Sequence, residues 1–260
     1  MNIFKSLFKP KGSIFEGLVD ESGTGGVLDK GDTWTLFFSV LAYSENDSDL
    51  IEEKITVHKT TTQEKAKKLM NQIEPLSLLK FSGEIVQEKN RRKLIMNDLI
   101  DSNWKNEKFT SFIADRIKPV HFESSLFGQL TLERAYDWFS GTGTWCEHKV
   151  GINYSSQEHN AAKVEEFAKT VVSDQTEWSK KINSGIIKDL LNLKNTSWLE
   201  DDEPTISEQD FLDKISLETI TFYDDGSFEF WYNDGDLFWG HSIQVDGSIN
   251  DGIDRATIVG

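Results

Sequence analysis

The sequence predicts an α+β protein built from two antiparallel-sheet units, the second a β-meander packed against two or three helices. Short runs of β-branched and aromatic residues between glycine-rich turns occur in both halves and indicate strands. Apolar residues recur at helical spacing in a long segment of the second half. The charge is also uneven about Pro119, because residues 1–118 carry 18 acidic and 18 basic side chains, whereas residues 119–260 carry 26 and 10. We therefore place the boundary between the units at Pro119.

The first unit is expected to be rich in strands. Residues 1–12 are assigned to a tail, because Lys5 interrupts their apolar run and no small-residue cleavage site follows. In residues 13–118, one helix is predicted where Ala66, Leu69 and Met70 share a helical face. Strands are predicted at residues 15–20, 33–43, 50–58 and 78–86. Residues 13–118 should thus form a β-rich domain with a single helix.

The second unit, residues 119–260, is expected to be an acidic α+β domain. Two helices are predicted near residues 158–173 and 175–194, the second from the spacing of four apolar residues: Trp178, Ile182, Ile186 and Leu190. Short strands should precede the helices at residues 127–133 and 136–154, and three more should follow at 217–223, 226–232 and 236–245. The last three strands make up the predicted meander.

Six aromatic rings lie within twelve residues around the turn at Asp234 and Gly235. A two-residue Asp-Gly turn would place Trp231 opposite Phe238 across a hairpin. Trp239 would then lie on the opposite, apolar face, beneath the helices. Glu229, Trp231 and Phe238 would share one face and form either a ligand platform or an interface between the two domains. Structural packing is the competing interpretation, because most aromatic pairs of this kind belong to a core.

Composition excludes several classes of protein. The net charge of −16 disfavours direct binding to nucleic acid, whose phosphates an acidic surface repels. No apolar stretch reaches the roughly 18 residues needed to span a bilayer, so stable membrane insertion is not expected. The single cysteine, Cys146, cannot form an internal disulfide, and a reducing cytoplasm suits the chain.

The acidic excess is greatest at the end of the chain, where residues 200–260 carry 16 acidic side chains against two basic ones. The stretch opens with four consecutive acids directly after an aromatic and leucine: Trp198, then Glu200, Asp201, Asp202 and Glu203. These residues are predicted to bind a basic protein partner, with the tryptophan as anchor and the acids as rim. The competing interpretation is a solvated connector whose acids precede a helix N-terminus.

No catalytic residue, cofactor or metal site is predicted. Cys146 and His148 alternate along one expected strand, but a zinc site needs further ligands and no second such pair is present. Residues 246–254 resemble a calcium loop in spacing but lack the turn glycine and the closing bidentate glutamate. Phosphate loops and nucleophile elbows are also absent from the sequence.

Four segments carry a resemblance to a known family. They are FGQLTLERAYDWFSG, the stretch from LLNLKNTSWLEDDEP to LETI, YDDGSFEFWYNDGDLFWGHSIQVDGS and, upstream, TWTLFFSVLAY. Together they resemble a bacterial family known as domain of unknown function 2262, through most of residues 120–260. The resemblance implies a bacterial, cytosolic protein with no established activity, and it transfers no catalytic residues.

These observations lead to two expected functions. The first is a noncatalytic cytosolic binding protein whose acidic C-terminal domain engages a protein partner, for example an immunity-like protein that masks a basic toxin or nuclease. The alternative is an enzyme or small-ligand receptor with a cleft between the two domains.

Overall fold

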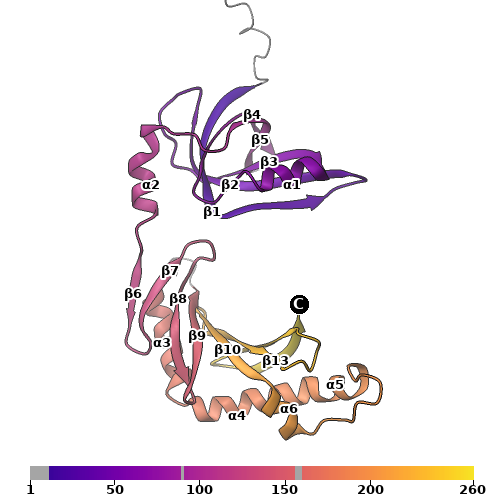
Figure 1. The fold of residues 1–260 in the computed structure, drawn as a ribbon. Helices are drawn as coiled ribbons and strands as arrows, with labels where there is room; N and C mark the ends of the chain where they lie inside the picture. Colours follow the sequence, from indigo (N-terminus) through magenta and orange to yellow (C-terminus); the bar gives the residue numbers. More distant parts are fainter. Residues whose placement is uncertain (1–11, 89–90, 156–159) are drawn as a thin grey trace, which may run out of the picture. The chain divides into compact units, whose positions relative to one another are not determined.

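The computed structural model describes residues 12–88, 91–155 and 160–260 (Figure 1). These residues divide into two compact units, with the division between Lys118 and Pro119. The expected tail, residues 1–12, lies outside the described residues except for Gly12.

The first unit is a closed five-stranded barrel with the strand order β1-β2-β3-β5-β4. Its elements are β1 (Ser13–Leu28), β2 (Thr33–Glu45), β3 (Ile55–Thr62), α1 (Gln63–Met70), β4 (Leu78–Glu88), β5 (Arg91–Asp101), η1 (Glu107–Phe109) and α2 (Thr110–Arg116). The expected all-antiparallel sheet is wrong at one place, because β3 and β5 run parallel. Helix α1 connects β3 to β4, and β4 pairs with β1. Strand β5 pairs with β4 on one side and with β3 on the other, which closes the barrel.

Alternating side chains fill the barrel. In β2, Leu36, Phe38 and Val40 are buried, whereas the residues between them are at least partly exposed, as expected of a strand with one face toward a core. The Phe15 and Phe81 rings stack with centroids 5.8 Å apart across the β1–β4 pair. Buried residues of all five strands contribute to the barrel core.

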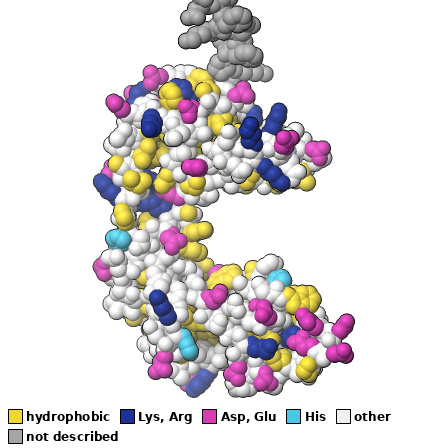
Figure 2. Space-filling model, viewed as in Figure 1, with side chains coloured by type: hydrophobic (Ala, Val, Ile, Leu, Met, Phe, Trp, Pro, Cys, Tyr) yellow, Lys and Arg dark blue, Asp and Glu magenta, His cyan; other side chains and the backbone are white. Residues whose placement is uncertain are grey.

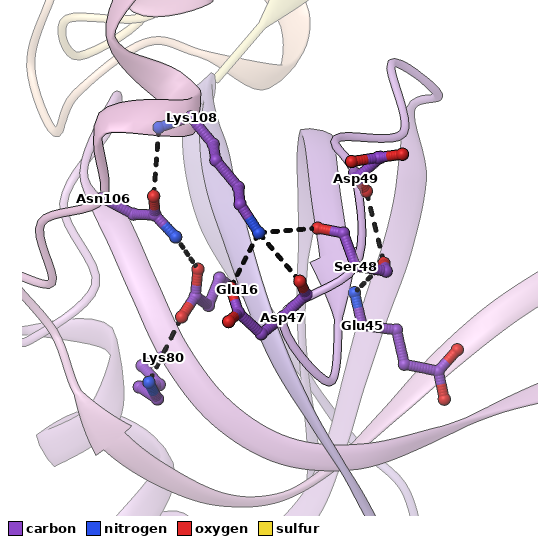
Figure 3. Close-up of polar contacts among 8 residues, drawn as sticks. All are labelled: Glu16, Glu45, Asp47, Ser48, Asp49, Lys80, Asn106 and Lys108. Atoms are coloured by element: carbon purple, nitrogen blue, oxygen red, sulfur yellow. Dashed lines mark hydrogen bonds and ion pairs between the residues drawn. The ribbon is translucent and has the colours of Figure 1, made fainter.

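A polar cluster fastens the segment before α2 to the barrel (Figure 3). The buried carboxylate of Glu16 accepts hydrogen bonds from Lys80 Nζ at 3.2 Å and from Asn106 Nδ2 at 2.5 Å. Lys108 Nζ donates to Asp47 Oδ1 at 2.7 Å, and this bond raises the pKa of Lys108. The Lys80 ammonium also lies 3.7 Å from the centre of the Trp104 ring. Because both oxygens of Glu16 are occupied, we interpret this cluster as a structural clasp.

The second unit is organised around one eight-stranded sheet with the order β13-β12-β11-β10-β9-β8-β7-β6 (Figure 1). Its strands are β6 (His121–Ser124), β7 (Gly128–Glu133), β8 (Trp138–Trp145), β9 (His148–Ser155), β10 (Ser216–Tyr223), β11 (Ser227–Asn233), β12 (Ser242–Ser248) and β13 (Gly252–Val259). The predicted three-strand meander is thus only part of a larger sheet. That sheet is also mixed, since β9 and β10 pair in parallel.

Every helix of this unit lies in the connection between β9 and β10. The helical elements are α3 (Ala161–Val172), α4 (Gln175–Ile186), the π-helical segment η2 (Ile187–Leu191), α5 (Asn192–Ser197) and α6 (Glu208–Lys214). Trp178, Ile182, Ile186 and Leu190 are buried, which confirms the predicted apolar stripe. Trp178 packs edge-on against Phe228 of β11, with ring centroids 5.2 Å apart. This stripe therefore contacts the sheet directly.

The predicted hairpin after β11 is wrong. Strand β12 starts only at Ser242, which pairs with Asn233, and Trp231 pairs with Gln244 instead of Phe238. Residues 234–241 form a loop between the two strands. The side chain of Asp234 accounts for this difference, because it binds backbone N–H groups within the loop.

Candidate functional site

The loop of residues 234–241 is built around the buried carboxylate of Asp234, which is 1% exposed. Its Oδ2 accepts hydrogen bonds from the backbone N–H of Phe238 at 2.7 Å and of Gly240 at 3.2 Å. Its Oδ1 accepts one from the N–H of Asp236 at 3.2 Å. One side chain thus satisfies three backbone donors that a two-residue turn would have left to the strand ladder.

This bonding pattern holds Trp239 in an unusual backbone conformation. Trp239 has φ 57°, in the left-handed region, which costs a bulky L-residue roughly 1–2 kcal/mol. Its side chain is 61% exposed, so the expectation that Trp239 lies buried beneath the helices is wrong. The hydrogen bonds of Asp234 offset the backbone strain, and the result is a tryptophan presented to solvent.

Trp198, at the end of α5, packs against this loop. Its ring centroid lies 4.7 Å from that of Trp239, 5.5 Å from Phe238 and 5.4 Å from His241. Phe238 is buried and also contacts Phe211 of α6. We call Trp198, Trp239 and His241, which all retain exposed surface, the aromatic patch.

His241 is fixed in place by the loop backbone. Its Nδ1 lies 2.5 Å from the carbonyl oxygen of Phe238. Because a carbonyl oxygen only accepts, we assign the proton to Nδ1, and Nε2 remains available to accept a hydrogen bond when the ring is neutral.

The acidic loop that follows Trp198 divides into two parts. Glu203 is used internally: its Oε2 accepts from Lys194 Nζ at 2.8 Å and from the N–H of Glu200 at 2.9 Å. Lys194 is only 2% exposed, and its ammonium also donates to the carbonyl oxygen of Trp198. The hydrogen bond from Lys194 lowers the pKa of Glu203 below its ordinary value.

The other three predicted acids are exposed and form what we call the acidic rim: Glu200, Asp201 and Asp202. Figure 2 shows acidic side chains gathered at the end of this unit where α5 and the loop after it lie. Three of the four predicted acids are therefore exposed, whereas Glu203 pairs with the buried Lys194.

The second predicted set, Glu229, Trp231 and Phe238, is not brought together. Trp231 Nε1 donates to Glu229 Oε2 at 2.9 Å, and both side chains lie on the half-exposed face of β11. Phe238 lies in the loop, buried in the core with Phe211. The error follows from the assumed two-residue turn, which set the wrong register for every residue after Asp234.

Sequence reasoning missed the roles of Asp234, Trp239 and His241. A usable signal was present, since Gly235 is followed by a second glycine, Gly240, within six residues. Two such positions favour a loop with several left-handed residues over a single tight turn. Both glycines do have positive φ, 59° and 84°.

The described residues offer neither a candidate metal site nor a candidate membrane-spanning helix. Residues 12–88, 91–155 and 160–260 contain no cluster of three or more His, Cys, Asp or Glu side chains suited to a metal ion. In the same residues, no helix combines the length and apolar character needed to cross a bilayer.

A comparison with known protein families finds a match that covers most of the second unit. The family model described as "Uncharacterized protein conserved in bacteria (DUF2262)" matches residues 124–258. The chain belongs to this family. The DUF2262 match runs from the end of β6 into β13, so it includes the helices, the aromatic patch and the acidic rim. No curated protein matches the chain.

Proposed function

We propose that this DUF2262 protein is a noncatalytic binding protein that engages a protein with a basic surface through the aromatic patch and the acidic rim. The observation that carries the proposal is Trp239, which is exposed and held in a strained conformation by a buried carboxylate. Strained residues that the surrounding structure supports concentrate at ligand clamps and binding sites.

The chemistry of the surface favours a cationic partner. Trp198 and Trp239 lie close enough to act as one aromatic contact, and tryptophan is enriched among residues that dominate binding energy. A lysine or arginine of the partner can pack over an indole face while its charge meets the acidic rim. Lys194 does not compete for the rim, because it is buried and paired with Glu203.

An immunity-like role is one version of this proposal. A toxin or nuclease that acts on nucleic acid depends on a basic surface, and an acidic protein bound there would mask it. The charge of residues 119–260, with 26 acidic and 10 basic side chains, supports rapid association with such a partner.

The decisive experiment compares matched baits. Full-length wild type, Trp239→Ala and Tyr136→Ala are used to capture partners from the bacterium that encodes the protein, and captured proteins are then purified and titrated. Tyr136 is the control because it is an equally exposed aromatic (64%) of the same unit, in the β7–β8 connection. We expect Trp239→Ala to weaken binding about 30-fold, as at a hot spot of ~2 kcal/mol, and Tyr136→Ala to leave it unchanged. Equal binding by all three baits would contradict the proposal.

A second variant tests the electrostatic part. Glu200→Gln, Asp201→Asn and Asp202→Asn are combined, and Glu203 is kept because it holds Lys194. The association rate with the captured partner should fall and lose most of its salt dependence, while the dissociation rate changes little. An association rate that is unchanged at low salt would show that the rim does not face the partner.

A further inference from the structure

A cavity of about 520 Å³ lies within the second unit, away from the residues of the aromatic patch. The β8–β9 turn, α4, the junction between α6 and β10, and the end of β11 form its walls. Its apolar lining consists of Trp145, Leu212, Ile215 and Leu217, and its polar lining includes Cys146, Ser179, Asn183 and Tyr232. A cavity of this size and mixed character is typical of sites for small organic molecules.

Tyr232 provides an unused hydrogen-bonding group in this cavity. The residue is 7% exposed and lines the wall, yet its hydroxyl makes no hydrogen bond within the described residues. Because it is not among the buried side-chain atoms that lack a hydrogen-bond partner, the hydroxyl keeps some solvent-accessible surface. Tyr232 lines the cavity, so we infer that a molecule bound there can reach the hydroxyl. Burial raises the pKa of Tyr232, so the hydroxyl keeps its proton and can donate.

The β8–β9 turn forms another part of the wall. Cys146 and Glu147 join β8 to β9 with φ of 45° and 72°, and the N–H of Cys146 donates to Gln175 Oε1 at 2.9 Å. Ser179 of α4 accepts a hydrogen bond from Trp145 Nε1 at 2.9 Å and lies 3.3 Å from Cys146 Sγ. These contacts fix the thiol and the indole at the cavity wall before any ligand arrives.

The charge of the lining differs from that of the unit around it. His148 and Lys149 line the cavity, and no acidic residue does so among the residues described. Lys149 forms no ion pair within the described part of the chain, even though acidic side chains outnumber basic ones 26 to 10 in residues 119–260. One exposed lysine and no carboxylate in the lining favour an anion over a cation.

We propose that this cavity binds a small organic carboxylate with a ring-sized apolar body. The body packs against Trp145, Leu212 and Leu217, and the carboxylate takes the hydrogen bond that Tyr232 offers and the charge of Lys149. Charge-assisted hydrogen bonds of this kind are stronger than neutral ones. The proposal concerns a different surface from the aromatic patch and does not depend on the protein partner.

The test uses two probes of nearly equal shape, 2-naphthoate and its neutral analogue 2-naphthamide, with the full-length protein. Cys146 is the single cysteine of the chain, so its alkylation by iodoacetamide, followed by mass spectrometry, reports directly on occupancy. We expect 2-naphthoate to slow alkylation with a dissociation constant of about 1 mM or below, the range set by a ligand of this size. The amide should protect several-fold less well at the same concentration.

Three variants then locate the site. Tyr232→Phe, which removes only the free hydroxyl, should weaken 2-naphthoate about tenfold, and Lys149→Gln should abolish the preference for the acid over the amide. Asn183→Trp, at a half-exposed position of α4, should fill the cavity and prevent protection. Trp239→Ala should leave protection unchanged, which separates this proposal from that of the protein partner.

Three results would overturn the inference. They are absence of protection at ten times the expected dissociation constant, equal protection by the two probes, and protection of Asn183→Trp as strong as that of wild type. Circular dichroism of each variant, compared with wild type, shows that a loss of binding does not arise from loss of the fold.

Discussion

Replacement of Asp234 by alanine should release the loop that presents Trp239 while the surrounding sheet stays folded. The Asp234 carboxylate holds three backbone N–H groups, and that of Phe238 is buried. An orphaned buried donor costs about 1–3 kcal/mol, and a half-buried donor that turns to water costs about 0.5–1.5 kcal/mol. The three lost bonds together predict a destabilisation of about 2–6 kcal/mol.

Part of that free energy returns when Trp239 leaves the left-handed region, which is worth about 1–2 kcal/mol. We therefore expect a net loss of about 3 kcal/mol for Asp234→Ala. Asp236→Asn is the matched control, because Asp236 is exposed and asparagine tolerates its positive φ of 64°.

Two measurements check the expectation. Urea denaturation gives the free energy of unfolding, and hydrogen exchange by mass spectrometry follows the peptide that spans residues 234–241. Exchange at Phe238 and Gly240 should accelerate in Asp234→Ala and stay slow in Asp236→Asn. If Asp234→Ala stays within about 1 kcal/mol of the control, the usual scale of surface substitutions, and exchanges as slowly, the assigned role of the carboxylate is wrong.

Three further predictions address the same unit. Phe230→Ala should lower the free energy of unfolding by about 3–5 kcal/mol in urea denaturation, because the ring is fully buried; a loss under about 1 kcal/mol would contradict its place in the core. Trp239→Gly should be about 1 kcal/mol more stable than Trp239→Ala in thermal unfolding, since glycine accepts a φ of 57° without strain; equal stability would argue against that strain. Glu203→Gln should destabilise the protein at neutral pH by leaving the Lys194 ammonium without its carboxylate. The pKa of Glu203 is lowered, so its contribution is present above the ordinary value of 4.5 and is lost as pH falls through the lower folded value. The difference between wild type and Glu203→Gln should therefore shrink in acid, and a constant difference would contradict the pairing.

Local periodicity was sufficient to predict the helices of the second unit. Trp178, Ile182 and Ile186 recur at helical spacing, and the structure buries all three. Such a stripe needs no knowledge of what covers it, because any core-facing helix shows the same pattern. The predicted end of the second helix was less accurate, because the helical path continues through η2 and α5 to Ser197.

The hairpin could not be derived in the same way. Asp-Gly favours a two-residue turn when the aspartate faces solvent and shapes only its own backbone. Here Asp234 is buried and accepts hydrogen bonds from N–H groups as far along the chain as Gly240, and no local sequence pattern specifies that burial. The approach of Trp198 to Trp239 depends on that loop, so the aromatic patch was out of reach of sequence reasoning.

The positions of the acidic residues were easier to predict than their roles. The run from Glu200 to Glu203 is evident in the sequence, and three of its acids are exposed as a partner-binding rim requires. The internal role of Glu203 was not evident, because a lysine nine residues earlier gives no sign of being buried. Burial of Lys194 follows from the packing of α5, which no local pattern specifies.

The parallel pairing of β9 with β10 also determines how the second unit assembles. Strands β6 to β9 form one set of antiparallel neighbours close in sequence, and β10 to β13 form another. Both sets can form early, but their union must wait for the helical connection between Ser155 and Ser216 to be ordered. Until then β9 and β10 present unpaired edges that can recruit strands of other copies, so nascent or truncated chains that lack this connection should be prone to aggregation.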